Sequence, residues 1–296
     1  MDSIEIKRVR DIPDALEKVR YFWQILPKEL EMCANRSSER ELYLLRHYYG
    51  YLMNVDKKRL RHIQNSYRYR IGSLVSSIGI GTDILDAGCG LGTESILCGI
   101  LGAKVIGVDL VEERLDIASK RLDLYRGILC EPIAVTFWPG SIFDVSGAFD
   151  VIYAKQSISH IDPAERFLRF SYEHLKPGGK LIIVDENALN PYVYLQCRRA
   201  RSERGGLYTK LENPRTGEVV SYAQERIFTV PSIKQRLINN GFEIRDIHMD
   251  GFCPYIPVMI KAEDLAYYVE SLFSRLPGVN MFGACYTITA RKRSSD

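Results

Sequence analysis

Between residues 82 and 186 the chain alternates short runs of apolar, β-branched residues with helix-like stretches. The runs are DILDAG, AKVIGVDL, IAVTFW, FDVIYA and KLIIVDE, and stretches such as EERLDIASKRLDLYRG separate them. Strands that alternate with helices form right-handed βαβ units on a parallel sheet. Because the runs are apolar along nearly their whole length, we expect both faces of the sheet to be covered. The pattern therefore predicts an α/β fold.

The segments before residue 82 and after residue 186 show other patterns. Residues 1–79 are predicted to be helical, with an apolar stripe that ends at Gly79, and residues 80–296 to form the α/β domain. Within that domain, residues 187–228 are polar, rich in Arg and Tyr, and predicted to be an irregular insertion. VPSIKQRLINNG and FEIRDIHM then resume the helix–strand pattern. Residues 262–276 read as an amphipathic helix, and CYTITARKR as a final strand.

Composition narrows the class of protein. The chain has 296 residues, 46% of them hydrophobic, and its 40 Lys+Arg and 37 Asp+Glu give a net charge of +3. That balance disfavours a chain whose main task is to coat nucleic acid or anionic lipid. The seven cysteines form no CxxC or Cys/His cluster, so neither a metal site nor a disulfide framework is predicted. With no membrane-spanning run and no signal-peptide pattern, we expect a cytoplasmic protein.

The sharpest motif is ILDAGCGLGTES at residues 84–95, where a strand ends in a glycine loop and a helix begins. Glycines let a ligand lie against the main chain. Asp109 ends the second strand, where an acidic side chain can accept both hydroxyls of a ribose. Both features belong to the carboxyl ends of the strands, which is where ligands bind in open α/β sheets.

Two cofactors could use such a loop. A nicotinamide dinucleotide normally requires G-x-G-x-x-G, whereas this chain has G-x-G-x-G with Asp86 before it. A carboxylate beside a diphosphate would cost about 1–4 kcal/mol for unit charges 4 Å apart. S-adenosylmethionine has no phosphate and carries an ammonium and a sulfonium. The charges therefore favour S-adenosylmethionine.

Five motifs in the stretch 82–186 resemble, in order, those of the class I S-adenosylmethionine-dependent methyltransferases. They are ILDAGCGLG, VIGVDL, VTFWPGSIFD, FDVIYAKQSISHI and LKPGGKLIIVDE. The resemblance is strongest to the small-molecule branch that includes quinone-biosynthesis enzymes. It implies a Rossmann-like sheet of seven strands whose last strand is antiparallel, which suits CYTITARKR.

The resemblance also implies a set of cofactor contacts. Asp86 and the loop would hold the methionine and ribose part, and Asp109 the ribose. Leu110, Ser141 and Ile142 would contact the adenine, and Ala154 and Lys155 would face the methionine tail. The implied set is Asp86, Gly88, Cys89, Gly90, Gly92, Asp109, Leu110, Ser141, Ile142, Ala154 and Lys155. Two members depart from the common pattern: Ser141 stands where many relatives have Asp, and Lys155 where a small residue is common. We expect Lys155 to point outward or to meet the cofactor carboxylate.

His160 follows the fourth strand and has two interpretations. A hydroxyl nucleophile needs its proton removed, and an imidazole suits that task near neutral pH. The alternative is that His160 caps the next helix together with Asp162. Asp185, Glu186 and Asn187 end the fifth strand at the same edge, where they could bind substrate or cap a loop.

The family places substrate covers where this chain has the N-terminal helices, the insertion 187–228 and the helix 262–276. Candidate pocket residues are five from the insertion, Tyr192, Tyr194, Tyr208, Tyr222 and Arg226, together with Tyr255, which precedes the helix 262–276. The N-terminal His47, Tyr48 and Tyr49 are expected to complete the lid. Basic runs at 56–70 and 198–215 are either solvated helix faces or Arg forks for an anionic acceptor. RNA is a third partner to consider, which the overall charge disfavours.

We therefore expect an S-adenosylmethionine-dependent methyltransferase that acts on a small molecule, more at oxygen than at nitrogen or carbon. After FDVIYA the chain has AKQS rather than the [DN]PP[YF] of many amino-methylating relatives. The alternatives are an N- or C-methyltransferase of an anionic metabolite or sugar, and an RNA methyltransferase. Outside this class stand a nicotinamide-dependent oxidoreductase and a module that binds the cofactor without turnover. The sequence does not predict an oligomeric state.

Overall fold

The computed structural model describes residues 18, 19, 22, 24, 25, 29, 41, 44, 70–252, 268–270, 272–276 and 278–293. In this part of the chain, seven strands form one sheet in the order β3-β2-β1-β4-β5-β9-β8. The strands are β1 (Asp83–Ala87), β2 (Lys104–Asp109), β3 (Val135–Pro139), β4 (Phe149–Lys155), β5 (Leu175–Glu186), β8 (Phe242–Asp250) and β9 (Cys285–Lys292). β1 to β5 pair in parallel, and β9 is antiparallel to both of its neighbours. The predicted seven-stranded sheet with an antiparallel last strand is confirmed.

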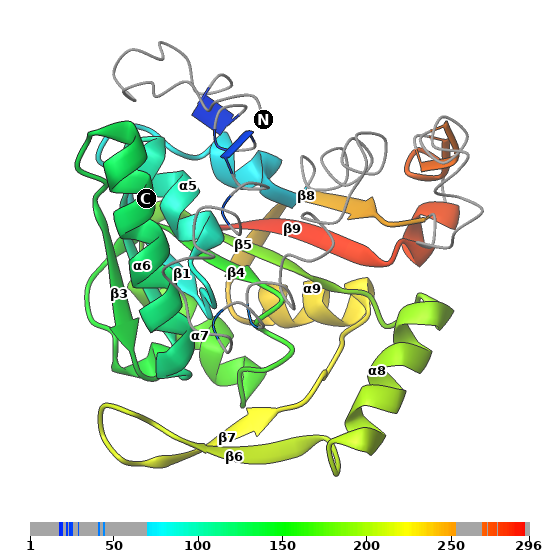
Figure 1. Ribbon diagram of the computed structural model, residues 1–296. Coiled ribbons are helices and arrows are strands. Elements are labelled where there is room, and N and C mark those ends of the chain that lie inside the picture. Colours follow the sequence, from blue (N-terminus) through cyan, green and yellow to red (C-terminus); the bar gives the residue numbers. More distant parts are fainter. Residues whose placement is uncertain are drawn as a thin grey trace.

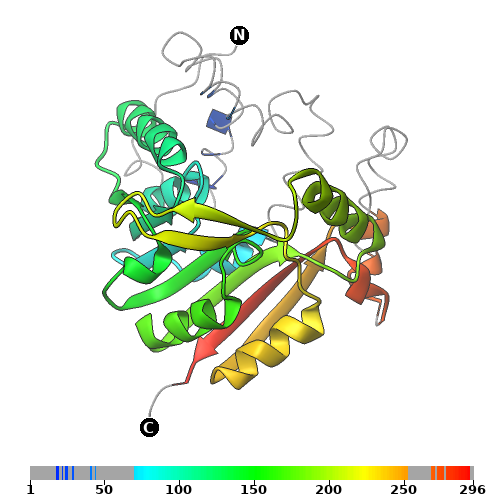
Figure 2. The ribbon, with the colours of Figure 1, turned by 90° about the horizontal axis from the view of Figure 1, so that it is seen from below.

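Helices cover both faces of the sheet, as the apolar strands predict (Figure 1). Neighbouring residues of a strand point to opposite faces, so Ile84 joins one core and Leu85 the other. α5 (Thr93–Ile100) and α6 (Glu112–Leu129) contribute to the first core, and α7 (Ala164–His174) and α9 (Val230–Asn239) to the second. Figure 2 shows the two pairs of helices on opposite sides of the sheet. A doubly covered sheet leaves its strand ends as the place for a site.

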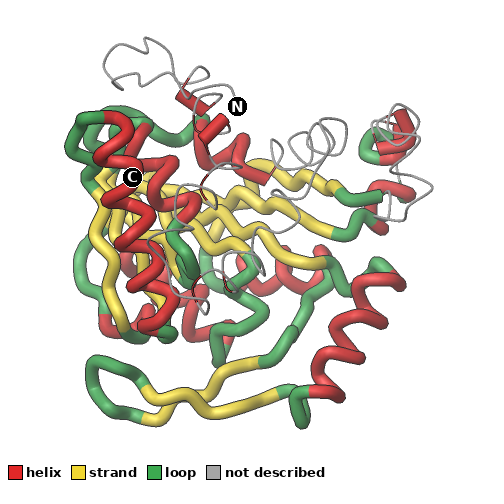
Figure 3. Tube along the Cα trace, viewed as in Figure 1, coloured by secondary structure: helices red, strands yellow, loops and turns green. Residues whose placement is uncertain are grey.

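The segment between β5 and α9 is more ordered than the sequence predicts. It holds a helix, α8 (Pro191–Glu203), and a two-stranded antiparallel hairpin of β6 (Tyr208–Glu212) and β7 (Val219–Ala223). In Figure 3 the two strands of this hairpin, drawn as yellow tubes, lie apart from the main sheet. Its side chains are mostly exposed or half-buried, so no apolar run marks its strands in the sequence. The expectation of an irregular segment is therefore wrong, and the role of residues 187–228 as an inserted substrate cover stays a prediction.

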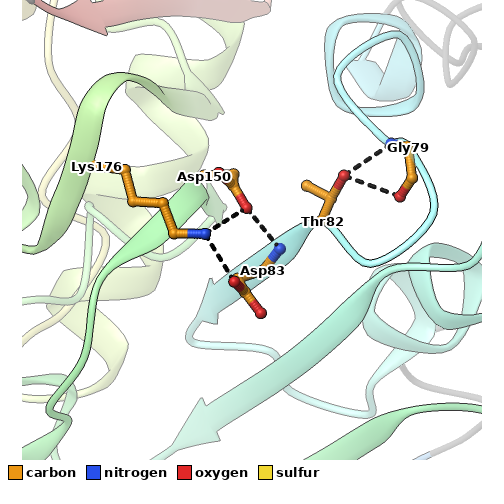
Figure 4. Close-up of polar contacts among 5 residues, drawn as sticks. All are labelled: Gly79, Thr82, Asp83, Asp150 and Lys176. Atoms are coloured by element: carbon orange, nitrogen blue, oxygen red, sulfur yellow. Dashed lines mark hydrogen bonds and ion pairs between the residues drawn. The ribbon is translucent and has the colours of Figure 1, made fainter.

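Polar contacts join the amino ends of the central strands (Figure 4). The Lys176 ammonium lies 2.7 Å from a carboxylate oxygen of Asp83 and 2.8 Å from one of Asp150. The Asp83 N–H donates to the same Asp150 oxygen at 2.9 Å. Burial alone would raise the pKa of Asp150, but the hydrogen bonds from Lys176 and Asp83 hold it below its usual value. The amino ends of the central strands are therefore joined by structural ion pairs and hydrogen bonds. The site lies at the opposite, carboxyl ends of the strands.

The described N-terminal residues pack on the first core. Phe22 and Ile25 are fully buried, and the Phe22 ring stacks on Tyr125 of α6 with centroids 5.4 Å apart. Glu29 is fully buried against Arg121 of α6. The division at residues 79/80 and the lid role of residues 1–79 remain predictions. His47, Tyr48 and Tyr49 lie outside the described residues, as do residues 262–267 and 271 of the predicted cover helix. No helix in the described residues is long and apolar enough to cross a membrane.

Candidate functional site

The glycine loop begins directly after β1 and leads into α5. The N–H groups of Gly88 and Cys89 both donate to the Val108 carbonyl of β2, which holds the loop against the neighbouring strand end. Gly90 has a φ of 54°, and a Cβ built there would meet nothing within 4 Å. A residue with a side chain would be strained there and would fill the open space. The loop therefore leaves its main chain accessible to a ligand.

Asp109 ends β2 beside this loop and is fixed by two backbone groups. The Gly90 N–H donates to one carboxylate oxygen at 3.0 Å, and the Val111 N–H donates to the other at 2.9 Å. The Arg114 guanidinium lies 3.6 Å away. Asp109 is 7% exposed. A carboxylate held in this way can accept further hydrogen bonds from hydroxyl groups without having to move.

Two adjoining cavities open at the carboxyl ends of β1, β2 and β4. The first, of about 340 Å³, includes Leu110, Ser141 and Ile142, together with Val219 and Val220 of the hairpin. The second, of about 350 Å³, includes the glycine loop and the end of β5. Both are lined by Gly88, Asp109, Arg114, Gln156, His160 and Tyr222. The predicted ribose residue, Asp109, thus lies where the two cavities meet.

The comparisons with known proteins agree with this arrangement. A family model described as a methyltransferase domain matches residues 44–247, more than half of the chain. The chain belongs to this methyltransferase family. The membership confirms the class inferred from the five motifs, and with it S-adenosylmethionine as the cofactor of the domain.

Individual relatives match over shorter stretches. The mouse mitochondrial ubiquinone biosynthesis O-methyltransferase is 34% identical over 109 residues, which are 36% of this chain and 29% of that protein. The ribosomal RNA small subunit methyltransferase C of Chromohalobacter salexigens is 36% identical over 118 residues, 38% of this chain and 33% of that protein. The chain thus spans about a third of the length of these curated relatives.

A solved structure shows the same fold. The magnesium protoporphyrin IX methyltransferase of Synechocystis, with bound S-adenosylhomocysteine, superposes with a TM-score of 0.53 at 18% identity. The match covers 86% of this chain and 95% of that one.

The second cavity of the methyltransferase is rich in carboxylates. Six acidic side chains line it: Asp86, Glu94, Asp109, Asp185, Glu186 and Glu225. Each of its three Lys or Arg side chains pairs with one of them, as Lys155 does with Glu94, Arg114 with Asp109 and Arg204 with Glu225. Among the described residues, the other three carboxyls form no ion pair. The cavity wall therefore favours a cation over a phosphate.

Burial raises the pKa values of the three acids that form no ion pair within the described part of the chain, Asp86, Asp185 and Glu186. Desolvation, followed by the nearby Glu94 charge, raises the pKa of Asp86 to about 7, although Ser95 donates a hydrogen bond to it at 2.6 Å. Desolvation raises the pKa of Asp185 to about 7, against hydrogen bonds from the N–H groups of Glu186 and Ser159. The pKa of Glu186 is also raised by burial. A cationic ligand would favour the ionised form of each group.

The residues around the two cavities can be matched with the chemical groups of S-adenosylmethionine. The open space at Gly90, the fixed carboxylate of Asp109 and the unmatched Asp86 suit a ligand with a ribose and two cationic centres. The Ser157 hydroxyl, on a residue 4% exposed, lines the first cavity and has no hydrogen-bond partner among the described residues. The residues therefore fit the cofactor. A diphosphate would face three uncompensated acids.

The structure places the predicted cofactor residues in two groups. Gly88, Cys89, Gly90, Asp109, Leu110, Ser141, Ile142, Asp86 and Lys155 line one or both cavities. Gly92 does not, because it packs against Phe137 at the start of α5. Ala154 is fully buried within the sheet and lines neither cavity. Lys155 pairs with Glu94, so its charge is balanced before it could oppose a sulfonium.

His160 lies at the junction of the cavities, in the loop between β4 and α7. Its Nδ1 is 2.9 Å from the Ala223 carbonyl, which can only accept, so Nδ1 carries the hydrogen. Its ring stacks on Tyr222 with centroids 5.0 Å apart and planes 8° apart. The N-cap residue of α7 is Pro163, with no side-chain cap. The capping interpretation of His160 is therefore wrong.

The predicted substrate residues are spread more widely. Asp185 and Tyr222 line the second cavity. Asn187 is fully buried and donates to the carbonyls of Met281 and Gly283, a structural role. The others lie away from both cavities or outside the described residues: Tyr192 and Tyr194 are exposed on α8, Arg226 pairs with Asp162 at 2.5 Å, Tyr208 is exposed on β6, and Tyr255 is not described.

Several lining residues were not predicted. Glu94 and Arg114 read as ordinary charged residues of helices, and Gln156 as part of a loop. Gln156 has a φ of 48°, a conformation that its sequence does not signal. Glu186, Cys197 and Glu225 bring potential ligand atoms within 4.8 Å of one another, and the Cys197 thiol donates to Glu186 at 3.0 Å. Their spacing in the chain hides this contact, because Glu186 ends β5, Cys197 lies on α8 and Glu225 lies in the loop before α9.

Proposed function

We propose that the protein transfers the methyl group of S-adenosylmethionine to an oxygen of a small organic molecule. The observation that carries the proposal is the position of His160 between the two cavities, with Nδ1 protonated and Nε2 hydrogen-bonded to no described residue. A neutral imidazole in this tautomer can accept a proton at Nε2. A hydroxyl acceptor needs such a base, whereas a neutral amine can attack first and release its proton afterwards.

The chain's own residues would divide the work as follows. When bound, the cofactor supplies an electrophilic methyl group. Asp109 accepts hydrogen bonds from the ribose, and Asp86 favours the cationic end of the ligand. The Ala223 carbonyl and the Tyr222 ring hold the His160 imidazole in place. His160 takes the acceptor proton at Nε2, in a cavity whose lining it shares with Asp109, Asp185 and Glu186.

The charge of the wall bears on the acceptor. Arg forks for an anion are one of the two interpretations of the basic runs, but within 198–215 Arg204 pairs with Glu225, Arg199 with Glu203, and Arg215 stacks on Trp138. The acceptor end of the second cavity carries Asp185 and Glu186. We therefore propose a neutral or cationic acceptor in place of the anionic one that the basic runs suggest. The carboxylates equally disfavour RNA, whose phosphates would meet this wall.

The names of the relatives divide between acceptors. The mouse relative is named for O-methylation in ubiquinone biosynthesis, and the Chromohalobacter relative for ribosomal RNA. A small-molecule acceptor accords with the first name and with two cavities of about 340 and 350 Å³.

Binding and turnover experiments test the proposal. Isothermal titration should show binding of S-adenosylmethionine and S-adenosylhomocysteine and none of NADH; binding of NADH alone would overturn the cofactor assignment. A labelled methyl donor should then label hydroxylated aromatic compounds in a panel that also contains amines and anionic sugars. Label found only on nitrogen or carbon would overturn the oxygen assignment. Cofactor binding without transfer to any panel member or extract fraction would favour a non-catalytic module.

The role of His160 has its own variant. His160→Ala should lower kcat about 10²–10⁴-fold, because general-base catalysis contributes about that factor. Affinity for S-adenosylhomocysteine should change little. His174→Ala is the matched control, since His174 also bonds a carbonyl through Nδ1 but lies on α7, outside the lining of both cavities. Equal rates in the two variants would show that His160 is not the base.

A further inference from the structure

The β6–β7 hairpin lies over a different part of the site from the one expected. The sequence predicts that the insertion covers the substrate. In the structure, Val219, Val220 and Ser221 of β7 line the first cavity, opposite the predicted adenine residues Leu110, Ser141 and Ile142. Figure 1 shows the hairpin beyond the carboxyl end of β3. The hairpin is thus a wall of the cavity that would hold the adenosine half of the cofactor.

One end of the hairpin is attached to the loop after β4. The Ala223 N–H donates to the His160 carbonyl at 3.0 Å, and the Arg226 N–H donates to the Ser159 carbonyl at 3.1 Å. A β-bridge joins Ile161 to Tyr222. These backbone contacts extend the hairpin onto the loop that carries the proposed base.

The far end of the hairpin is attached to the loop after β3. Asn213 is 1% exposed, and its amide donates to the Asp144 carboxylate at 2.7 Å. The same Asp144 oxygen accepts the N–H of Ser141, one of the predicted adenine residues. The Arg215 guanidinium lies over the Trp138 ring, 4.4 Å from its centroid. The hairpin therefore spans the first cavity and is fastened on both sides of it.

Asn213 also shapes the turn of the hairpin. Its N–H donates to the Glu218 carbonyl at 2.8 Å, its carbonyl accepts from Gly217 at 2.8 Å, and its side-chain oxygen accepts from the Arg215 N–H at 3.1 Å. One buried amide thus joins the turn of the hairpin to the adenine loop. Buried hydrogen bonds of this kind are costly to break.

We propose that the hairpin is part of the methyl-donor site and retains the adenosine half of the cofactor, with Asn213 as its positioning residue. The inference rests on the proposed function, because it takes the first cavity as the adenosine site. It differs from the substrate cover expected of this insertion, since the occupant contacted is the donor. The inference also links donor binding to proton removal. The hairpin that retains the donor carries the Ala223 carbonyl, which fixes the tautomer of His160.

The test compares dissociation rates in the full chain. Asn213→Ala removes the buried anchor, and Arg215→Ala removes only the contact with Trp138, so the second variant serves if the first folds poorly. We expect S-adenosylhomocysteine to dissociate about tenfold faster from Asn213→Ala, and less so from Arg215→Ala, because the first variant loses the buried hydrogen bond to Asp144 and the one from the Arg215 N–H. Arg199→Ala, which breaks an exposed pair on α8 of the same insertion, should dissociate at the wild-type rate.

Binding of adenosine alone shows which half of the cofactor the hairpin contacts. If the hairpin touches the adenosine half, both variants lose affinity for adenosine by the same factor as for S-adenosylhomocysteine. A loss for S-adenosylhomocysteine without one for adenosine would overturn the inference, as would unchanged dissociation in both folded variants. A wild-type protein that binds neither S-adenosylmethionine nor S-adenosylhomocysteine would instead overturn the proposed function, and the inference with it.

Discussion

At the scale of single residues, the ribose assignment depends on Asp109. Its carboxylate is oriented by the N–H groups of Gly90 and Val111 before any ligand arrives. We expect Asp109→Ala to weaken binding of S-adenosylhomocysteine by about 1.5–3 kcal/mol, the value of hydrogen bonds to a charged group. Isothermal titration measures this change.

The control for Asp109 is Asp116→Ala, an exposed acid on α6. Asp109→Asn provides a second variant, because it keeps the size of the side chain if the alanine variant leaves the loop N–H groups unpaired. Affinity equal to that of the Asp116 variant in both would mean that the ribose binds elsewhere.

Some site residues could be predicted from the sequence because a spacing marks them. The glycines of a strand–loop–helix junction and an acid at the end of the next strand always meet at one edge of a parallel sheet, so Gly90 and Asp109 could be placed together. Glu94 could not, because an acid in the first turn of a helix is common for reasons unrelated to ligands. Gly92 fits the same motif, yet it packs against Phe137. The motif marks the loop, and only the structure separates its packing positions from its open ones.

At the scale of secondary-structure elements, the sheet was predictable and the hairpin was not. The central strands β1, β4 and β5 are buried on both faces and therefore carry apolar runs. β6 and β7 pair with each other in a sheet of their own, and in the described part of the chain the hairpin is joined to the rest of the protein at its two ends, as by the bridge from Tyr222 to Ile161. Asn213, Asp144 and the loop at His160 are far apart in the chain, so no local pattern records their contacts.

A second prediction at this scale concerns the attachment of the N-terminal segment to α6. The Arg121 guanidinium donates to both carboxylate oxygens of Glu29, at 2.7 and 3.1 Å, and to the Thr93 hydroxyl at 2.9 Å. Arg121→Met leaves a buried Glu29 without this cation, which should cost about 3–5 kcal/mol of unfolding free energy in urea. The double variant Arg121→Met, Glu29→Leu should recover part of the loss.

Arg199→Met is the control for this pair, because Arg199 and Glu203 are both exposed and their pair should matter little. If Arg121→Met destabilises no more than Arg199→Met does, the N-terminal segment does not depend on this ion pair for its attachment. A loss that the double variant fails to reduce would assign the effect to the Thr93 and Leu91 contacts of Arg121 instead.

At the scale of the whole molecule, the acids at the two ends of the strands differ in the ion pairs that they form. The chain carries a net charge of +3, yet the second cavity holds six acids against three Lys or Arg side chains. The acids of the amino edge, Asp83 and Asp150, pair with Lys176. Unmatched acids are thus found at the edge where the cofactor would bind. Keeping them there costs stability, because buried carboxyls resist ionisation.

The last prediction follows from that cost. Burial and the Glu94 charge raise the pKa of Asp86 from its ordinary value of 3.8 to about 7. Above the lower value the unfolded chain has released this proton while the folded chain still holds it, so Asp86 makes stability fall as the pH rises towards 7. Asp86→Asn cannot titrate. Its gain in unfolding free energy over wild type should therefore be roughly 2–3 kcal/mol larger at pH 8 than at pH 5.

The same variant should bind S-adenosylmethionine more weakly, most of all at pH 8, because the ionised Asp86 attracts the cationic ligand. Wild-type affinity should rise between pH 6 and pH 8 as Asp86 ionises, and the rise should be smaller in Asp86→Asn. Asp185 has a similarly raised pKa but is present in both proteins, so it cancels from the comparison. Urea denaturation and titration calorimetry at each pH measure the two effects. If Asp86→Asn is more stable but binds S-adenosylmethionine as tightly as the wild type does, Asp86 takes no part in cofactor binding. If the variant is more stable and binds more weakly, the protein retains a destabilising buried acid because it binds the cationic cofactor.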